Sequence, residues 1–178
     1  MTVGWGFIGT GNYPSSRMAP AAALAEGTSI VACFSREQSR ADEFAKIHGV
    51  LAAYTSVDEM LADSREEVVF VASPNHLHAE HAKLAAKAGK HVLVEKPITN
   101  TLEQADTLIN LAEQHGRILQ VGHLERFNPA MLALEQELSE ARFIESHRLA
   151  PYNPRGSEVN VVLDLMIHDI DIILYIVD

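Results

Sequence analysis

The fold is decided by the stretch Val3-Gly4-Trp5-Gly6-Phe7-Ile8-Gly9-Thr10-Gly11-Asn12-Tyr13-Pro14. Its first six residues predict a short buried strand, and a helix is expected from Pro14, because proline is favoured in a first helical turn. Gly9 permits a tight turn, and Gly11 lets the backbone approach a pyrophosphate that the helix N-terminus would stabilise. Pro14 replaces the third glycine of the usual fingerprint, so an ordinary glycine-rich loop remains the alternative. The candidate cofactor turn consists of Gly9, Thr10, Gly11, Asn12 and Tyr13.

Strand and helix patterns alternate along the chain as far as Val121, which predicts an α/β fold with a parallel, doubly wound sheet. The expected strands are Val3–Ile8, Ser29–Phe34, a short one at Tyr54, Val68–Ala72, His91–Glu95 and Ile118–Val121. The expected helices are Pro14–Glu26, Gln38–His48, Val57–Ala62, His78–Ala88 and Thr101–His115. Ser56 and Glu59 form a capping-box pattern at the start of the third helix.

A domain boundary is expected near Gly122, which gives a dinucleotide-binding domain over 1–122 and a second unit over 123–178. The second unit has too few elements to bury a core alone. They are a helix over Pro129–Ala141, a strand over Phe143–Leu149, a loop over Ala150–Ser157 and one long apolar helix over Val161–Val177.

The composition suits a soluble globular protein, with 47% hydrophobic and 21% charged residues among 178. A formal net charge of −10 argues against nucleic acid or an anionic membrane as a partner. The single cysteine, Cys33, excludes a disulfide within the chain and suits a reducing compartment. No secretory signal and no apolar run of roughly 20 residues are seen. The expected location is therefore the cytoplasm.

Lys96 follows the apolar run His91-Val92-Leu93-Val94 and is preceded by Glu95. Ligands of open α/β sheets bind beyond the carboxyl ends of the strands, so Lys96 is a candidate catalytic residue. Asp164 and His168 stand four apart in a helical pattern, which would place them on one face. The alternatives are a solvated lysine and a histidine satisfied within the core.

The end of the second strand bears on the choice of cofactor. An acidic residue there would select NAD, but the chain reads Cys33-Phe34-Ser35-Arg36. Ser35 and Arg36 suit a 2′-phosphate, which favours NADP over NAD, although Arg36 can also be a solvated residue at a helix start.

Three motifs together resemble the Gfo/Idh/MocA oxidoreductases, and a fourth matches that family's later Asp-x-x-x-His pattern. They are Gly9-Thr10-Gly11, Ser73-Pro74-Asn75-His76-Leu77-His78, Gly89 to Pro97, and Asp164 to Asp171. The last carries Met166 where many members have glycine. The resemblance implies a Rossmann domain followed by an α/β substrate domain with a mostly antiparallel sheet, of which only the beginning is present. It also implies a homo-oligomer for the full-length protein.

The resemblance also implies roles for individual residues. Lys96 matches the catalytic lysine, and Asp164 and His168 match its acidic and histidine partners. Glu95 matches the acid beside the nicotinamide ribose. The turn that lines the cofactor near the nicotinamide would include Ser73, Pro74, Asn75 and His78.

We therefore expect an NAD(P)-dependent dehydrogenase that acts on a hydroxyl of a sugar, nucleotide sugar or cyclitol. Free lysine has a pKa of about 10.4, whereas histidine titrates near neutrality, so His168 is the expected proton acceptor and Lys96 the group that positions the hydroxyl. A non-catalytic dinucleotide sensor and an inactive fragment are the alternatives. No metal site is expected, because no cysteine or acidic cluster accompanies His76, His78 and His81.

Overall fold

The computed structural model describes residues 2–137, 142–149 and 160–177. Two compact units result, Met1–Val121 and Gly122–Asp178, and each is described separately. The loop expected over 150–157 lies outside the described residues. The reading of the second unit as the start of a substrate domain remains a prediction.

The first unit is a six-stranded parallel sheet in the order β3-β2-β1-β4-β5-β6, which is the doubly wound order of a Rossmann fold. The strands are β1 (Val3–Ile8), β2 (Thr28–Phe34), β3 (Ala52–Tyr54), β4 (Val68–Val71), β5 (His91–Val94) and β6 (Leu119–Val121). The apolar runs of β1, β2, β4 and β5 occupy the middle of the sheet, and the short strands β3 and β6 form its edges. The predicted fold class is confirmed.

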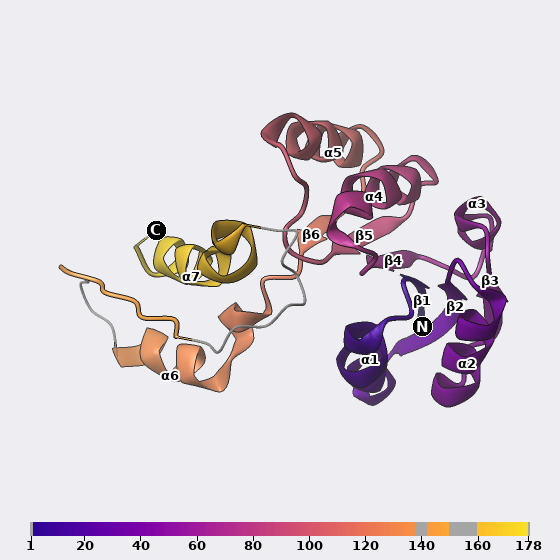
Figure 1. Cartoon of the computed structure of the whole chain (residues 1–178), viewed down its shortest axis with the longest axis horizontal. Helices are drawn as coiled ribbons and strands as arrows, with labels where there is room; N and C mark the ends of the chain where they lie inside the picture. Colours follow the sequence, from indigo (N-terminus) through magenta and orange to yellow (C-terminus); the bar gives the residue numbers. More distant parts are fainter. Residues whose placement is uncertain (1, 138–141, 150–159, 178) are drawn as a thin grey trace. The chain divides into compact units, whose positions relative to one another are not determined.

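Helices cover both faces of the sheet (Figure 1). On one face, Ala19, Ala41 and Phe44 pack with Phe7 and Phe70 of the central strands. On the other face, Met60, Leu61, Ala82, Ala85 and Leu108 of the helices pack with Ile8, Val69 and Val94 of the strands. The helices are α1 (Ala19–Leu24) and α2 (Gln38–His48) on the first face, and α3 (Val57–Leu61), α4 (His78–Lys87) and α5 (Leu102–Gln114) on the second.

The first turns of two helices in the first unit, α3 and α1, can be compared with the sequence prediction. Ser56 accepts a hydrogen bond from the backbone N–H of Glu59, so the predicted cap of α3 is present. The helix expected from Pro14 begins as a π-helical turn over Pro14–Met18, and α1 continues from Ala19. The chain therefore leaves the glycine turn through a wider helical turn than the sequence predicted.

The second unit contains α6 (Pro129–Glu137) and α7 (Ile167–Val177). A π-helical turn, Val162–Met166, precedes α7, so the long regular helix expected over 161–177 is interrupted in its first part. The prediction of a strand over 143–149 is wrong, because the structure places those residues outside any strand. A strand needs a neighbour for its backbone hydrogen bonds, and among the described residues none pairs with this segment.

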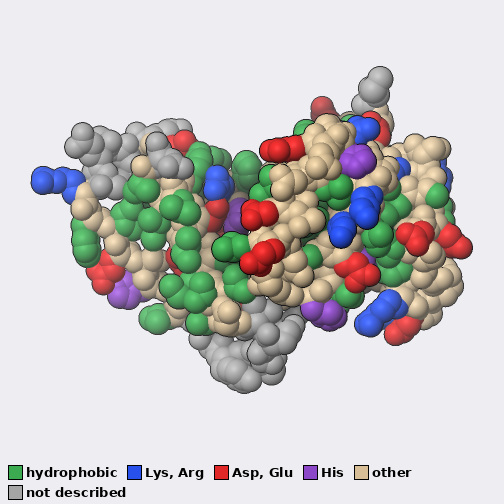
Figure 2. Space-filling model, turned by 90° about the horizontal axis from the view of Figure 1, so that it is seen from above, with side chains coloured by type: hydrophobic (Ala, Val, Ile, Leu, Met, Phe, Trp, Pro, Cys, Tyr) green, Lys and Arg blue, Asp and Glu red, His purple; other side chains and the backbone are tan. Residues whose placement is uncertain are grey.

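Large apolar side chains are exposed on the second unit. They include Phe127, Leu132, Leu134, Phe143, Val161, Met166, Leu174 and Val177. Figure 2 shows hydrophobic side chains gathered on the left side of the picture. No helix among the described residues is long and apolar enough to cross a membrane.

Candidate functional site

Strand β1 lies between β2 and β4, and the strand order reverses at this point. A crevice forms at such a switch point, beyond the carboxyl ends of the strands, and it is where open α/β sheets bind ligands. The segments that leave β1, β4 and β5 here are Gly9–Tyr13, Ser73–Asn75 and Glu95–Lys96. The first unit therefore brings three of the sequence-predicted segments to one edge of its sheet.

The glycine turn has one crowded and one open position. Gly9 has a φ of +114°, and a Cβ atom there would lie 2.6 Å from the carbonyl oxygen of Ala72. The turn after β1 thus packs directly on the end of β4, which only glycine permits. Gly11 is exposed, and a Cβ atom there would meet no atom within 4 Å. Open space above this turn suits the approach of a phosphate group to the backbone.

Tyr13 connects the glycine turn to the end of β5 through Glu95. Burial, followed by the neighbouring Glu95 carboxylate, raises the pKa of Tyr13 to about 12. Burial also raises the pKa of Glu95, while Lys96 and Tyr13 oppose that rise. The backbone N–H of Lys96 donates to Oε2 of Glu95 at 3.3 Å. Glu95 thus holds the phenol and the lysine-bearing turn together, a link that the sequence motif does not reveal.

The turn after β4 is held by two histidines of α4. The Nε2 atom of His78 lies 2.8 Å from the carbonyl oxygen of Ser73, and its Nδ1 atom lies 2.8 Å from the carbonyl oxygen of Pro97. The Nδ1 atom of His81 lies 2.9 Å from the Ser73 hydroxyl. His78 is only 1% exposed, so these contacts hold the turn from the buried side. Asn75 is half-buried and Pro74 is exposed.

Ser35 and Arg36 follow β2 beside the glycine turn. The backbone N–H of Gly9 donates to the carbonyl oxygen of Phe34 at 3.1 Å, which places the end of β2 next to the turn. Ser35 is buried, whereas Arg36 is exposed and its charge faces solvent. Of the two residues predicted to meet a 2′-phosphate, Arg36 is the more accessible.

Asp164 and His168 lie in the second unit, and both are partly exposed. Asp164 belongs to the π-helical turn and His168 to the first turn of α7. Their placement on one helical face remains a prediction. Their proximity to Lys96 remains a prediction.

The sequence interpretation missed the partner of Arg126. Its guanidinium donates two hydrogen bonds to Asp171, at 2.8 and 2.5 Å, and also lies over the Tyr175 ring. Arg126 lowers the pKa of Asp171 through these bonds, although burial opposes the shift. The Arg126 guanidinium is therefore paired with a carboxylate of the chain itself. Arg148 and Asp169 form a similar pair nearer the surface.

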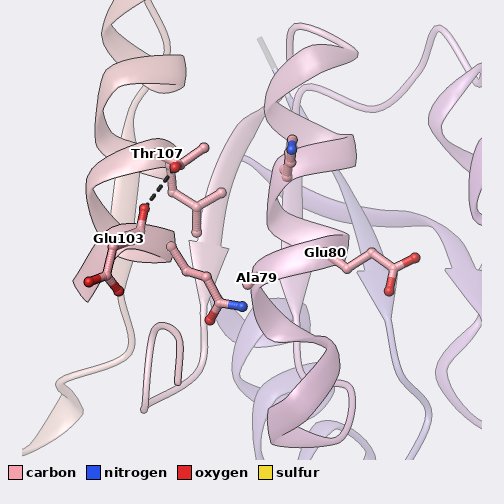
Figure 3. Close-up of a pocket in the computed structure, with 7 residues that line it drawn as sticks. Ala79, Glu80, Glu103 and Thr107 are labelled. Carbon is pink, nitrogen blue, oxygen red and sulfur yellow. Dashed lines mark hydrogen bonds between the residues drawn. The ribbon is translucent and has the colours of Figure 1, made fainter. Parts of the chain in front are cut away.

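A groove of about 380 Å³ lies between α4 and α5, as Figure 3 shows. Glu80 points away from the gap, and the Thr107 hydroxyl donates to the carbonyl oxygen of Glu103 within α5. The lining consists of Ala79, Glu80, Lys83, Glu103, Gln104, Thr107 and Leu108. None of the predicted cofactor or catalytic residues lines this groove, so it is separate from the switch point. No group of His, Cys, Asp or Glu suited to a metal ion occurs among the described residues.

A doubly wound parallel sheet with a glycine turn at its switch point defines a dinucleotide-binding α/β protein. Comparison with known families identifies the family within this class. Residues 3–123 match the family described as "Oxidoreductase family, NAD-binding Rossmann fold", the Gfo/Idh/MocA family. The chain belongs to this family, and the resemblance seen in its motifs is confirmed.

Individual relatives act on sugars, nucleotide sugars or cyclitols according to their names. The UDP-N-acetylglucosamine 3-dehydrogenase of Acidithiobacillus ferrooxidans is 41% identical over 123 residues, which cover 68% of this chain and 39% of the relative. A solved structure of that enzyme matches with a TM-score of 0.89 and 34% identity, covering 99% of this chain and 57% of the other. The NADP(+)-dependent scyllo-inositol 2-dehydrogenase IolU of Bacillus subtilis is 36% identical over 131 residues, 74% of this chain and 40% of the relative.

The 3-ketoreductase KijD10 from Actinomadura kijaniata, solved in complex with NADP, matches with a TM-score of 0.73 and 29% identity, covering 77% of this chain and 44% of that one. The chain thus spans about half the length of the relatives it matches.

Proposed function

We propose that the protein is an NAD(P)-dependent oxidoreductase that transfers a hydride between a nicotinamide cofactor and a hydroxyl-bearing carbon of its substrate. The observation that carries this proposal is the convergence of the glycine turn, the Ser73–Asn75 turn and Glu95–Lys96 at the carboxyl ends of β1, β4 and β5. The open space at Gly11 suits the pyrophosphate, and the exposed Arg36 suits the 2′-phosphate of NADP.

The proposed catalytic residues act on the reacting hydroxyl of the substrate or support the residues that do. The bound nicotinamide supplies the hydride acceptor in the oxidising direction. Lys96 binds the reacting hydroxyl and polarises it, and His168 accepts the hydroxyl proton as the hydride leaves the carbon. Asp164 orients His168 or binds a further hydroxyl of the substrate. Glu95 anchors the lysine-bearing turn and lies on the side of the nicotinamide ribose.

The proposed substrate is a sugar, a nucleotide sugar or a cyclitol. Support comes from the names of the relatives, which include a UDP-N-acetylglucosamine dehydrogenase and a scyllo-inositol dehydrogenase. A homo-oligomer is proposed for the longer protein. A cytoplasmic location is proposed because the one cysteine, Cys33, is a buried free thiol.

The proposal is tested by titrating the chain with NADPH and NADH and following nicotinamide fluorescence. A version extended to the length of the relatives is then assayed for hydride transfer with UDP-N-acetylglucosamine, scyllo-inositol and simple sugars. Replacing Lys96 by Ala should abolish turnover while leaving cofactor affinity within about threefold, because the lysine acts on the substrate hydroxyl. Undiminished turnover in this variant would refute the role of Lys96.

A non-catalytic dinucleotide sensor is the second candidate, because the chain alone covers only about half of its relatives. The extended version separates the two functions. Tight cofactor binding with no hydride transfer to any hydroxylated substrate would favour the sensor.

A further inference from the structure

Tyr13 extends from the glycine turn past the end of the neighbouring strand. Strand β4 lies between β1, which the glycine turn follows, and β5, which Glu95 follows. Tyr13, Ala72 and Leu93 all pack against the core cluster on the face that α1 and α2 cover. Side chains alternate between the two faces of a strand, so Glu95, two residues after Leu93, continues on this face. The contact between Tyr13 and Glu95 therefore crosses the end of β4.

The carboxylate of Glu95 has one oxygen held by the chain and one left over. Its Oε2 atom accepts the backbone N–H of Lys96 at 3.3 Å. Its Oε1 atom is closed off from solvent and has no hydrogen-bond partner among the residues that the structure describes. A buried acceptor without a donor is unfavourable, so a ligand hydroxyl at Oε1 would stabilise it. Such a hydroxyl can reach Oε1 only after a neighbouring side chain moves.

The Tyr13 phenol lies beside this carboxylate. Burial raises the pKa of Tyr13 most, and the charge and a side-chain hydrogen bond of Glu95 raise it further. Burial raises the pKa of Glu95, whereas the N–H and the charge of Lys96 and the hydrogen bond from Tyr13 lower it. The phenol thus holds the carboxylate in a closed arrangement and leaves Oε1 without a donor. Tyr13 itself is half-buried, so its ring has solvent on one side into which it can move.

We propose that Tyr13 is a latch on the cofactor crevice, whose phenol closes over Glu95 until a hydroxyl of the cofactor takes its place on the carboxylate. A dinucleotide with its pyrophosphate at Gly11 and its nicotinamide beside Lys96 must also cross the end of β4. The incoming donor is a ribose hydroxyl of the nicotinamide half, which bonds Oε1 when the phenol withdraws. Closed molecules do not bind cofactor, so the latch lowers the apparent affinity by the fraction that is open. This inference rests on the proposed function for the identity of the ligand.

The test compares Tyr13→Phe with the parent 178-residue chain by fluorescence titration with NADPH and NADH. Phenylalanine keeps the ring that packs on the core but lacks the hydroxyl that bonds Glu95. The affinity for both cofactors should rise by about threefold to tenfold, because more molecules are open. The matched control is Tyr175→Phe, which removes a phenol bonded to the Glu135 carboxylate at 3.0 Å in the second unit and should change neither affinity. Unchanged or weaker cofactor binding by Tyr13→Phe would overturn the latch.

A half-cofactor separates the latch from a general effect on the glycine turn. Adenosine 2′,5′-bisphosphate carries the 2′-phosphate but has no nicotinamide ribose, so it does not extend to Glu95. Its affinity, measured by calorimetry, should be the same for the parent chain and Tyr13→Phe. A gain as large as that for NADPH would overturn the latch, because the substitution would then act on the adenosine side of the crevice.

A measurement without cofactor distinguishes failure of the latch from failure of the proposed function. The carboxyl carbon of Glu95 is followed by ¹³C NMR through a pH titration of both chains. Loss of the Tyr13 hydroxyl should raise the pKa of Glu95, because a hydrogen bond to the carboxylate favours its charged form. Identical titrations would overturn the latch, even in a chain that binds no cofactor. A raised pKa in Tyr13→Phe, in a parent chain that binds neither NADPH nor NADH, would support the closed contact and count against the proposed function.

Discussion

A Cβ atom on Gly6 would lie 2.7 Å from the carboxyl carbon of Glu66, so the Glu66 side chain rests directly on the middle of β1. Glu66 is 3% exposed, and neither carboxyl oxygen has a hydrogen-bond partner in the described part of the chain. Lys90 lies close, but its ammonium donates to the backbone oxygens of Asp63 and Glu66. Burial raises the pKa of Glu66 to about 7, although the charge of Lys90 opposes the rise.

This buried acid should make stability fall as the pH rises. The folded state holds the proton more tightly than the unfolded state, so the contribution is complete below pH of about 4.5 and is lost as the pH rises to about 7. The shift of the pKa from 4.5 to about 7 corresponds to about 3 kcal/mol. Glu66→Gln should remove this loss, as measured by urea unfolding at pH 5 and pH 8. The exposed neighbour Glu67 serves as the control, because the Glu67→Gln variant should still lose stability between pH 5 and pH 8. An equal loss in the parent and in Glu66→Gln would disprove the assignment.

Gly9 and Gly11 should respond differently to the same added methyl group. Gly9→Ala forces a strained φ and a clash with Ala72, so the free energy of unfolding should fall by roughly 1–3 kcal/mol. Gly11 has open space and no positive φ, so Gly11→Ala should change stability by less than about 0.5 kcal/mol. It should nevertheless weaken cofactor binding by about tenfold, because the methyl group occupies the approach of the pyrophosphate. Thermal unfolding and NADPH titration measure the two effects, and unchanged NADPH affinity in Gly11→Ala would argue against that approach.

The sequence correctly predicted helices, strands and caps that depend only on neighbouring residues. The apolar run Val3–Ile8 and the cap at Ser56 depend on neighbouring residues, and both occur where the pattern indicated. The strand predicted over 143–149 failed because pairing needs a distant partner that periodicity does not detect. The link between Tyr13 and Glu95 and the pair of Arg126 and Asp171 join residues far apart in the chain, and composition and spacing carry no signal for such contacts.

The exposed charge at Arg36 should decide the preference between the two cofactors. Arg36→Ala removes the guanidinium expected to meet the 2′-phosphate, so NADPH affinity should fall by about tenfold while NADH affinity hardly changes. Fluorescence titration of both cofactors measures this. Arg117→Ala is the matched control, because Arg117 is also exposed but lies before β6, at the opposite edge of the sheet. Equal loss of affinity for both cofactors would mean that Arg36 does not read the 2′-phosphate.

The pair of Arg126 and Asp171 should stabilise the second unit. Asp171 is 8% exposed but the Arg126 side chain is 39% exposed, so Arg126→Met should cost about 1–2 kcal/mol, less than the loss of a partner in a fully buried pair. Because the pKa of Asp171 is lowered in the folded state, the stabilisation is present above the unfolded pKa and is lost as the pH falls through the folded value. Amide hydrogen exchange at pH 7 should show α7 losing protection in Arg126→Met. The pair of Arg148 and Asp169, whose carboxylate is more exposed than that of Asp171, provides the control, since Arg148→Met should cost less than about 1 kcal/mol. Equal loss of protection in the two variants would show that burial of Asp171 does not set the strength of its pair.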